Sequence, residues 1–272
     1  MALRDLESVD VKHGTMGCLP YAALGEGPPV AVLSGLSPTT GFGGKWGVRT
    51  MLGPVASLAG SHRLFVFNRR PHLPRGLTMG AIAAEHASAL REGFGTPVDV
   101  VGASTGGSIA QQLAADHPEV VRRLVLISTA CRLGERGRTL QRRVAARVRA
   151  GAHRQALAVL AADLVPSRPA GIAAGAGAWL LGPSVIRGPG DLDDMATTIE
   201  AEDTFDLAKC ERPITAPTLI VVGGEDHAYS PELFEETARL IAGSDLQMFA
   251  GRGHVSVMSD PRFLPALSTF LA

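Results

Sequence analysis

The sequence contains few cysteines and no excess of charge of either sign, and these absences narrow its function. Its 272 residues include three cysteines, Cys18, Cys131 and Cys210, which are widely spaced and form no Cys-x-x-Cys pair. This pattern argues against a disulfide framework and a zinc site, and it is typical of a reducing compartment. The 26 basic and 26 acidic residues balance to a formal net charge of +0, which argues against a nucleic-acid partner.

Two further absences concern export and membranes. The first ten residues, MALRDLESVD, carry charges where a signal peptide needs an apolar core, so no export signal is predicted. Residues 169–186 carry no charge, but they are mostly alanine and glycine and include Pro169 and Pro183. Their mean apolarity is too low for a lipid environment, so we expect a buried or pocket-lining segment. We therefore expect a soluble, cytoplasmic protein without a membrane partner.

The rest of the chain alternates between short apolar runs and longer stretches with helical patterning. Near-continuous apolar runs are typical of strands in a parallel sheet covered on both faces, so the alternation predicts the α/β class. The predicted strands are residues 9–11, 19–24, 30–33, 64–67, 98–101, 124–128, 217–223 and 246–249. The predicted helices are residues 49–58, 78–92, 106–117, 231–241 and 261–271.

One long segment interrupts this alternation. Residues 132–205 contain no convincing strand, only helical stretches separated by prolines. A chain of this length suits one α/β unit with an insertion. We therefore expect an α/β core formed by residues 1–131 and 206–272, with residues 132–205 inserted as a helical cap or lid.

The central motif is Gly102-Ala103-Ser104-Thr105-Gly106, which lies between an apolar strand and a helix. A Gly-x-Ser-x-Gly turn in this context is a nucleophile elbow, in which the serine has strained backbone angles and an exposed hydroxyl. Gly102 and Gly106 are needed because a Cβ at either position would collide where strand and helix approach. The bare pattern is weak evidence, but its place between strand and helix makes Ser104 the candidate nucleophile.

A serine hydroxyl needs a base to take its proton, and His254 is the candidate. It follows the last predicted strand directly, and the preceding Gly251-Arg252-Gly253 allows the loop to fold back over the sheet. His72 and His227 also fall on loops after strands. The other five histidines lie at turns, at the ends of elements, within a helix or in the insertion.

The acid that orients this histidine is expected between the serine and the histidine in the chain. Asp226 follows a buried strand, 28 residues before His254. Glu225 is the alternative, because two adjacent side chains in a tight turn cannot both point inward. A surface acid without a catalytic role is the structural alternative for this turn. We expect His227, the next residue, to pack at the rim of the pocket.

Backbone N–H groups would receive the oxyanion that forms during acyl transfer. The N–H of Thr105 lies at the start of the helix after the elbow, where the helix dipole assists it. The second donor would be the N–H of Leu36, which follows Ser34-Gly35 after an apolar strand. Gly35 allows this loop to approach closely, so we also expect Ser34 and Gly35 to line the pocket.

These motifs together resemble the α/β-hydrolase superfamily over nearly the full length of the chain. The matching parts are Ser34 to Pro38, the elbow at residues 102–106, Gly224-Glu225-Asp226 and Gly251 to His254. The resemblance implies a mostly parallel eight-stranded sheet with helices on both faces. It also implies a lid between the sixth and seventh strands, which is where the helical insertion falls.

Two positions depart from the usual pattern of that superfamily. Ser34 stands where many members have a histidine before the glycine, which leaves the backbone donor but changes the side chain. The loop Asn68-Arg69-Arg70-Pro71 replaces a common Asp-x-Arg-Gly sequence, which weakens any analogy of substrate. Arg69 and Arg70 either meet a substrate carboxylate or brace the loop.

The insertion carries two features that bear on substrate and partners. Its large apolar residues either close an apolar pocket over the serine or pack between helices; they are Leu160, Leu164, Ile172, Trp179, Leu180 and Leu181. We place Trp179 and Leu180 in the pocket. Residues 132–154 hold eight arginines and one glutamate, and we interpret them mainly as a solvated helix face. Docking of an acyl carrier protein or a coenzyme A thioester is the alternative.

The sequence thus predicts a serine hydrolase that acts on an ester, thioester or lactone of a mainly apolar small molecule. Ser104, His254 and Asp226 would form the triad, with no cofactor and no metal. A lyase or acyl-modifying enzyme of a biosynthetic pathway is the first alternative, because a fold does not fix a reaction. A binding protein with an inert triad is the second.

Overall fold

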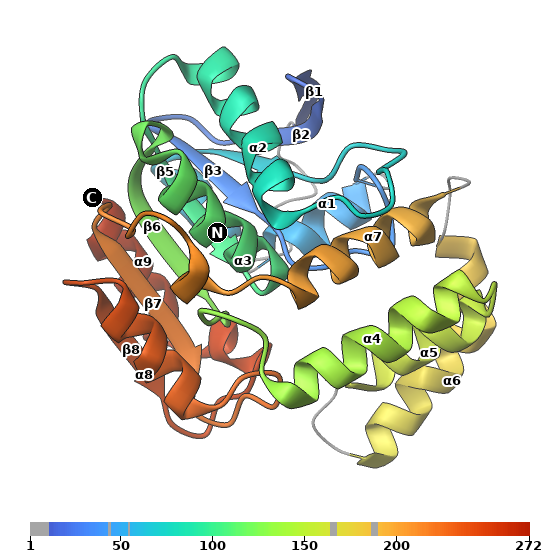
Figure 1. Cartoon of the computed structure of the whole chain (residues 1–272). Coiled ribbons are helices and arrows are strands. Elements are labelled where there is room, and N and C mark those ends of the chain that lie inside the picture. Colours follow the sequence, from blue (N-terminus) through green and yellow to red (C-terminus); the bar gives the residue numbers. More distant parts are fainter. Residues whose placement is uncertain (1–10, 43–44, 54, 164–167, 186–189) are drawn as a thin grey trace.

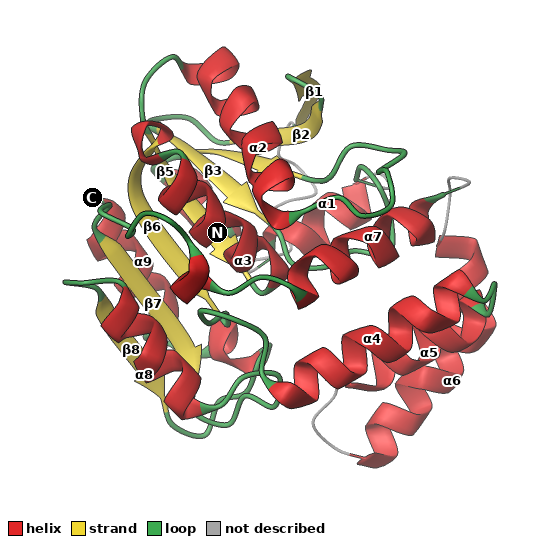
Figure 2. Ribbon diagram, in the orientation of Figure 1, coloured by secondary structure: helices red, strands yellow, loops and turns green. Residues whose placement is uncertain are grey.

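The computed structural model describes residues 11–42, 45–53, 55–163, 168–185 and 190–272. A central sheet carries helices on both faces, and a group of helices extends from one side of it (Figure 1). Figure 2 shows the same arrangement by secondary structure. The strands are β1 Lys12–Met16, β2 Leu19–Leu24, β3 Pro29–Leu33, β4 Arg63–Phe67, β5 Val98–Ala103, β6 Val121–Ile127, β7 Thr218–Gly223 and β8 Asp245–Phe249.

The eight strands form one sheet in the order β1-β2-β4-β3-β5-β6-β7-β8. The pairs β1–β2 and β2–β4 are antiparallel, and all the other neighbours are parallel. This confirms the predicted α/β class and the mostly parallel eight-stranded sheet. The carboxyl ends of the central parallel strands meet at one edge, where an open α/β sheet places its site.

Helices cover both faces of the sheet, as the apolar strands require. The α-helices are α1 Lys45–Leu52, α2 Met79–Phe94, α3 Thr105–Asp116, α4 Glu135–Arg149, α5 His153–Asp163, α6 Arg168–Val185, α7 Asp191–Asp203, α8 Pro231–Leu240 and α9 Phe263–Leu271. The 3-10 helices are η2 Ala56–Gly60, η3 Pro118–Val120, η4 Leu207–Lys209 and η5 Ser256–Ser259.

The core divides into one cluster on each face. One cluster joins α2, α3 and α8 to strand residues such as Val100, and the other joins α1 and α9 to residues such as Val101. Adjacent strand residues point to opposite faces, so β5 is buried on both sides. Thr78 caps α2 as predicted, with its hydroxyl accepting the N–H of Ala81 at 3.2 Å.

Two predicted elements are wrong in their bounds. The predicted strand at residues 9–11 falls mostly outside the described residues, and β1 begins at Lys12 with polar residues that give no strand signal. The predicted helix at residues 49–58 is two elements, because α1 ends at Leu52 and η2 begins at Ala56. A proline at position 54, itself outside the described residues, explains the break, since proline cannot continue a helix and disfavours helical backbone before it.

The insertion leaves and rejoins the core at one point. Arg132 and Asp206 form an isolated antiparallel bridge, and the N–H of Leu207 donates to the carbonyl of Cys131 at 2.8 Å. Between these residues the described chain is helical, from α4 to α7. Val144 and Val148 of α4 pack against Met195 and other apolar residues of α7 in a third cluster.

The long uncharged segment forms α6 and packs against α5, on the outer side of the insertion (Figure 1). Within the described residues, no helix combines the length and apolarity needed to cross a membrane.

Candidate active site

Ser104 occupies a strained turn between β5 and α3. Its backbone has φ 51° and ψ −124°, in the left-handed region that side chains rarely adopt. A Cβ on Gly106 would lie 2.1 Å from the carbonyl oxygen of Leu33, and one on Gly102 would lie 2.6 Å from the carbonyl oxygen of Gly106. Only glycine fits at either position. Strained backbone of this kind is concentrated at functional sites.

The structure brings Ser104, His254 and Asp226 into one chain of hydrogen bonds. The Oγ of Ser104 lies 3.0 Å from Nε2 of His254, and Nδ1 of His254 lies 2.8 Å from Oδ2 of Asp226. A carboxylate only accepts, so Nδ1 carries the proton that it donates to Asp226, and Nε2 accepts from the serine hydroxyl. These residues follow the carboxyl ends of β5, β8 and β7.

Asp226, and not its neighbour Glu225, points inward. Asp226 is buried, and its Oδ1 accepts the N–H groups of Ala228 at 2.8 Å and Tyr229 at 3.2 Å. Glu225 is exposed, as is His227. Of the two adjacent acids, only Asp226 is therefore turned toward His254.

Two residues that the sequence did not single out support His254. Ser128 follows β6 with φ 48°, and its hydroxyl donates to the backbone carbonyl of His254 at 2.7 Å. The buried ring of Tyr229 stacks on the imidazole, with ring centroids 6.0 Å apart. Both contacts join residues far apart in the chain, and no local motif announces them.

The two N–H groups expected to receive an oxyanion are available. In the part of the chain that the structure describes, the N–H groups of Leu36 and Thr105 have no hydrogen-bond partner. Gly35 passes so close to the elbow that a Cβ on it would lie 3.3 Å from Cβ of Ser104. The side chain of Asn68 fixes this loop, because its Nδ2 donates to the carbonyls of Thr39 and Gly41 at 3.1 and 2.6 Å.

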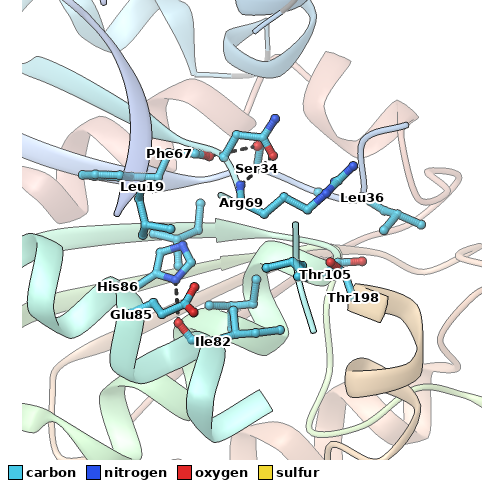
Figure 3. Close-up of a pocket in the computed structure, with 15 residues that line it drawn as sticks. Leu19, Ser34, Leu36, Phe67, Arg69, Ile82, Glu85, His86, Thr105 and Thr198 are labelled. Atoms are coloured by element: carbon cyan, nitrogen blue, oxygen red, sulfur yellow. Dashed lines mark hydrogen bonds between the residues drawn. The ribbon is translucent and has the colours of Figure 1, made fainter. Parts of the chain in front are cut away.

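A narrow cavity of about 30 Å³ lies beside these donors (Figure 3). It is lined by Leu19, Leu33, Ser34, Gly35, Leu36, Phe67, Asn68, Arg69, Leu73, Ile82, Glu85, His86, Thr105, Ile109 and Thr198. Ser34 and Gly35 therefore line a pocket, as expected. Trp179, Leu180 and His227 do not line it.

The position of Trp179 and Leu180 corrects the expectation that they close the pocket. They are 44% and 64% exposed on α6, and Ile172 and Leu181 are exposed with them. Gly175 and Gly182 lie on the packing face of α6 instead, since a Cβ on Gly182 would lie 2.5 Å from the side chain of Leu157 on α5. The large residues of α6 consequently face solvent. Leu164 lies outside the described residues.

Glu202 on α7 is a buried acid next to the elbow, and no sequence motif indicates it. Its carboxyl group accepts the hydroxyls of Thr105 at 2.8 Å and Ser108 at 2.9 Å, and the amide of Gln141 at 2.8 Å. Burial raises the pKa of Glu202, because desolvation outweighs these hydrogen bonds. The group links the first turn of α3 to α4 of the insertion.

The arginines of residues 132–154 are mostly paired within the protein. The ion pairs, each at or below 3.7 Å, are Arg132–Glu236, Arg136–Asp163, Arg138–Asp203, Arg142–Asp203, Arg149–Asp193 and Arg149–Glu200. Arg154 instead lies over the ring of Trp179, 5.2 Å from its centroid. This pairing reduces the charge that the stretch offers to an acidic partner. Among the described residues, no cluster of three histidine, cysteine or acidic side chains could hold a metal ion.

The sequence profile of the alpha/beta hydrolase family matches residues 24–266. The chain belongs to the alpha/beta hydrolase family. This confirms the resemblance that the motifs indicated, over most of the chain. A comparison with curated proteins finds no significant match.

Several solved structures resemble this chain over almost its whole length. The enol-lactonase from Burkholderia xenovorans LB400 has a TM-score of 0.73 and 22% identity, covering 96% of this chain and 99% of that one. A hydrolase from Pseudomonas aeruginosa PA01 has a TM-score of 0.67 and 22% identity, covering 97% of this chain and 98% of that one. A thermophilic esterase from Thermogutta terrifontis has a TM-score of 0.63 and 23% identity, covering 96% of this chain and 98% of that one. At these identities the likeness concerns the fold alone.

The tight elbow predicts a large cost for a side chain at Gly106. In Gly106→Ala the new Cβ meets backbone atoms of Leu33 and Ser34 that cannot move independently of the sheet. We expect the free energy of unfolding, measured in urea, to fall by about 1–3 kcal/mol. The control is Gly177→Ala on α6, where nothing lies within 4 Å and stability should rise by about 0.5–1 kcal/mol. Equal effects of the two substitutions would contradict this view of the elbow.

The raised pKa of Glu202 predicts a pH dependence of stability. Below the pKa of the unfolded chain, Glu202 is protonated in both states; above it, the native state still holds the proton that the unfolded state has lost. The unfolding free energy of the wild type should therefore fall as the pH rises from about 4.3 toward the raised native pKa. Glu202→Gln cannot lose this proton, so its stability relative to the wild type should increase over that range.

Urea denaturation at several pH values between 4 and 8 measures this difference. Glu236→Gln is a control of opposite sign, because the hydrogen bond from Arg132 lowers the pKa of Glu236. The contribution of Glu236 to the unfolding free energy is present above the pKa of this group in the unfolded chain, and it disappears as the pH falls through the lowered native pKa. Parallel stability curves for the wild type and Glu202→Gln would mean that burial does not shift this carboxyl group.

Proposed function

We propose that this protein is a serine hydrolase that cleaves an ester, thioester or lactone of a small molecule through an acyl-enzyme. The observation that carries the proposal is the continuous relay from Ser104 through His254 to Asp226, at 3.0 and 2.8 Å. Both distances are within hydrogen-bonding range before any substrate is bound. Family membership and the fold support hydrolytic chemistry at this position.

In the proposed reaction, Oγ of Ser104 attacks the substrate carbonyl while Nε2 of His254 takes the hydroxyl proton. The carbonyl oxygen becomes an oxyanion, which the N–H groups of Leu36 and Thr105 receive. The imidazolium formed at this stage is stabilised by Asp226. His254 then gives its proton to the leaving alcohol or thiol, and the C–O or C–S bond breaks to leave the acyl group on Ser104.

Water completes the cycle by the same route. His254 takes a proton from the water molecule, whose oxygen attacks the acyl-enzyme carbonyl. The bond between Oγ and the acyl carbon breaks, the proton returns to Ser104, and the carboxylic acid leaves. No step needs a group from outside the chain apart from substrate and water.

The cavity beside the two donors supports a small acyl group. Its lining is largely apolar, with seven large apolar side chains: Leu19, Leu33, Leu36, Phe67, Leu73, Ile82 and Ile109. The volume of about 30 Å³ compares with the roughly 10–15 Å³ that one water molecule needs, so the cavity suits only a short acyl chain. The names of similar structures, an enol-lactonase and an esterase, fit ester or lactone cleavage.

Replacement of the nucleophile tests the proposal most directly. Ser104→Ala should lower kcat on a short p-nitrophenyl ester by at least about 10⁴-fold, because the acyl-enzyme can no longer form. The variant should also lose labelling by a fluorophosphonate probe. Ser244→Ala, remote from the site, is the control and should retain both. A wild-type protein that neither hydrolyses esters nor accepts the probe would favour an inert binding protein.

The narrow cavity predicts a preference for short acyl chains. We expect kcat/KM on p-nitrophenyl esters to fall from butyrate to decanoate, because a long chain exceeds the volume of the cavity. A steady rise with chain length would place the acyl chain elsewhere, for example under the insertion. Thioesters of the same short acids with coenzyme A or an acyl carrier protein can be compared in the same way, by their kcat/KM.

Isotope incorporation separates hydrolysis from its alternative. In ¹⁸O-labelled water a hydrolase must place the label in the released acid, because water attacks the acyl-enzyme carbonyl. A lyase or an acyl-modifying enzyme on the same fold would give an unlabelled product. Mass spectrometry of the product decides between them.

A further inference from the structure

Arg69 is a buried cation in the wall of the cavity. It follows Asn68 after β4, and Figure 3 shows its side chain extending from there toward Leu36, close to Thr105. Its Nη1 donates to the carbonyl of Ser37 at 2.8 Å and its Nη2 to the carbonyl of Asp191 at 3.1 Å. Its Nε is buried and has no partner among the described residues.

The two acids whose charges act on this guanidinium, Asp194 and Asp191, accept hydrogen bonds from backbone N–H groups of the surrounding loops. Asp194 accepts the N–H groups of His72 and Leu73 at 2.9 and 2.7 Å, and Asp191 accepts the N–H of Thr40 at 3.0 Å. No ion pair within 4.0 Å joins Arg69 to an acid of the described chain. Burial lowers the pKa of Arg69 to about 10, and the charges of Asp194 and Asp191 offset only part of this effect.

The other titratable groups of the cavity do not balance this charge. Glu85 pairs with Arg70 at 2.8 Å. His86 is neutral, because burial lowers its pKa to about 4, and its Nδ1 bonds to the carbonyl of Ile82 at 2.9 Å. At neutral pH the cavity therefore holds a guanidinium with an unused N–H and no contacting anion.

We propose that Arg69 binds a carboxylate carried on the acyl part of the substrate. The preferred substrates are then half-esters of short dicarboxylic acids, or lactones and thioesters with a carboxylate at the corresponding position. A carboxylate suits the planar fork of a guanidinium, whose Nε–H and remaining terminal N–H groups can donate to its two oxygens. This inference rests on the proposed hydrolase function and specifies its substrate class.

The position of Arg69 identifies the acyl side and limits its length. Leu36 and Thr105, whose N–H groups would hold the scissile carbonyl oxygen, line the same cavity as Arg69. The acyl group would extend from these donors into the cavity, and the carboxylate would end beside the guanidinium. A cavity of this size accommodates only a short connection between the two groups.

A matched pair of esters tests the inference. Monomethyl succinate and methyl butyrate have the same acyl backbone and differ in a terminal carboxylate or methyl group. We expect kcat/KM of the wild type, measured by methanol release, to be higher for the half-ester by about 10- to 100-fold, the range of one charge-assisted hydrogen bond. Monomethyl glutarate tests the next chain length.

Two variants show whether Arg69 is responsible. Arg69→Met keeps most of the side-chain volume without the charge, and it should abolish the ratio of kcat/KM between the half-ester and the butyrate. The ratio is the readout, because loss of the contact with Ser37 could lower both activities together. Arg75→Met is the matched control, since Arg75 is exposed on the same loop and does not line the cavity, and it should keep the ratio.

Failure of this inference is distinct from failure of the hydrolase proposal. Hydrolysis of methyl butyrate without preference for the half-ester, or a preference that survives in Arg69→Met, overturns the inference alone. If the wild type turns over neither ester, calorimetry with Ser104→Ala measures binding of monomethyl succinate against methyl butyrate. Tighter binding of the half-ester supports the carboxylate site, and equal or absent binding overturns it.

Discussion

The left-handed backbone of Ser104 is the constraint on which the site depends. A side chain in this conformation costs on the order of 1–3 kcal/mol unless its surroundings hold it. Here the N–H of Ser104 donates to the carbonyl of Ile127 at 2.9 Å, and Gly102 and Gly106 allow the strand, the helix and β3 to meet without side chains. Because the turn is so short, the first free N–H of the helix, on Thr105, directly follows Ser104.

The features that the sequence predicted are those encoded locally. The elbow needs glycines at fixed spacing, and Asp226 and His254 follow apolar strands within a few residues. A parallel sheet collects the ends of its strands at one edge, so these local signals were sufficient to predict which residues would meet. The choice of Asp226 over Glu225 followed from the geometry of a tight turn.

The features that the sequence did not predict depend on contacts between distant segments. Ser128 and Tyr229 contact His254 from other loops, and each is an ordinary residue in its own surroundings. Glu202 lies on a helix of mixed composition, where an acid usually faces water. The orientation of α6 was missed because two of its glycines, and not Trp179, lie on the packing face.

Polar contacts at the site join the insertion to the core, beside the apolar contacts that Ala201 and Phe205 make with the core cluster. Glu202 accepts from Thr105 on the core side and from Gln141 on the insertion side, and all of its partners are neutral. A buried carboxyl group with several donors specifies one arrangement of the helices around it, because displacement would leave these groups unsatisfied. Thr105, the residue after Ser104, thereby shares an acceptor with Gln141 of α4.

The bridge between Arg132 and Asp206 has a consequence for how such a molecule can diverge. The two ends of the insertion meet at this bridge. Each doubling of the chain length between the two ends costs only about 0.6 kcal/mol in closure entropy. The helical insertion can therefore be shortened, lengthened or exchanged without displacement of the strands. The insertion and the sheet can therefore change at separate rates during evolution.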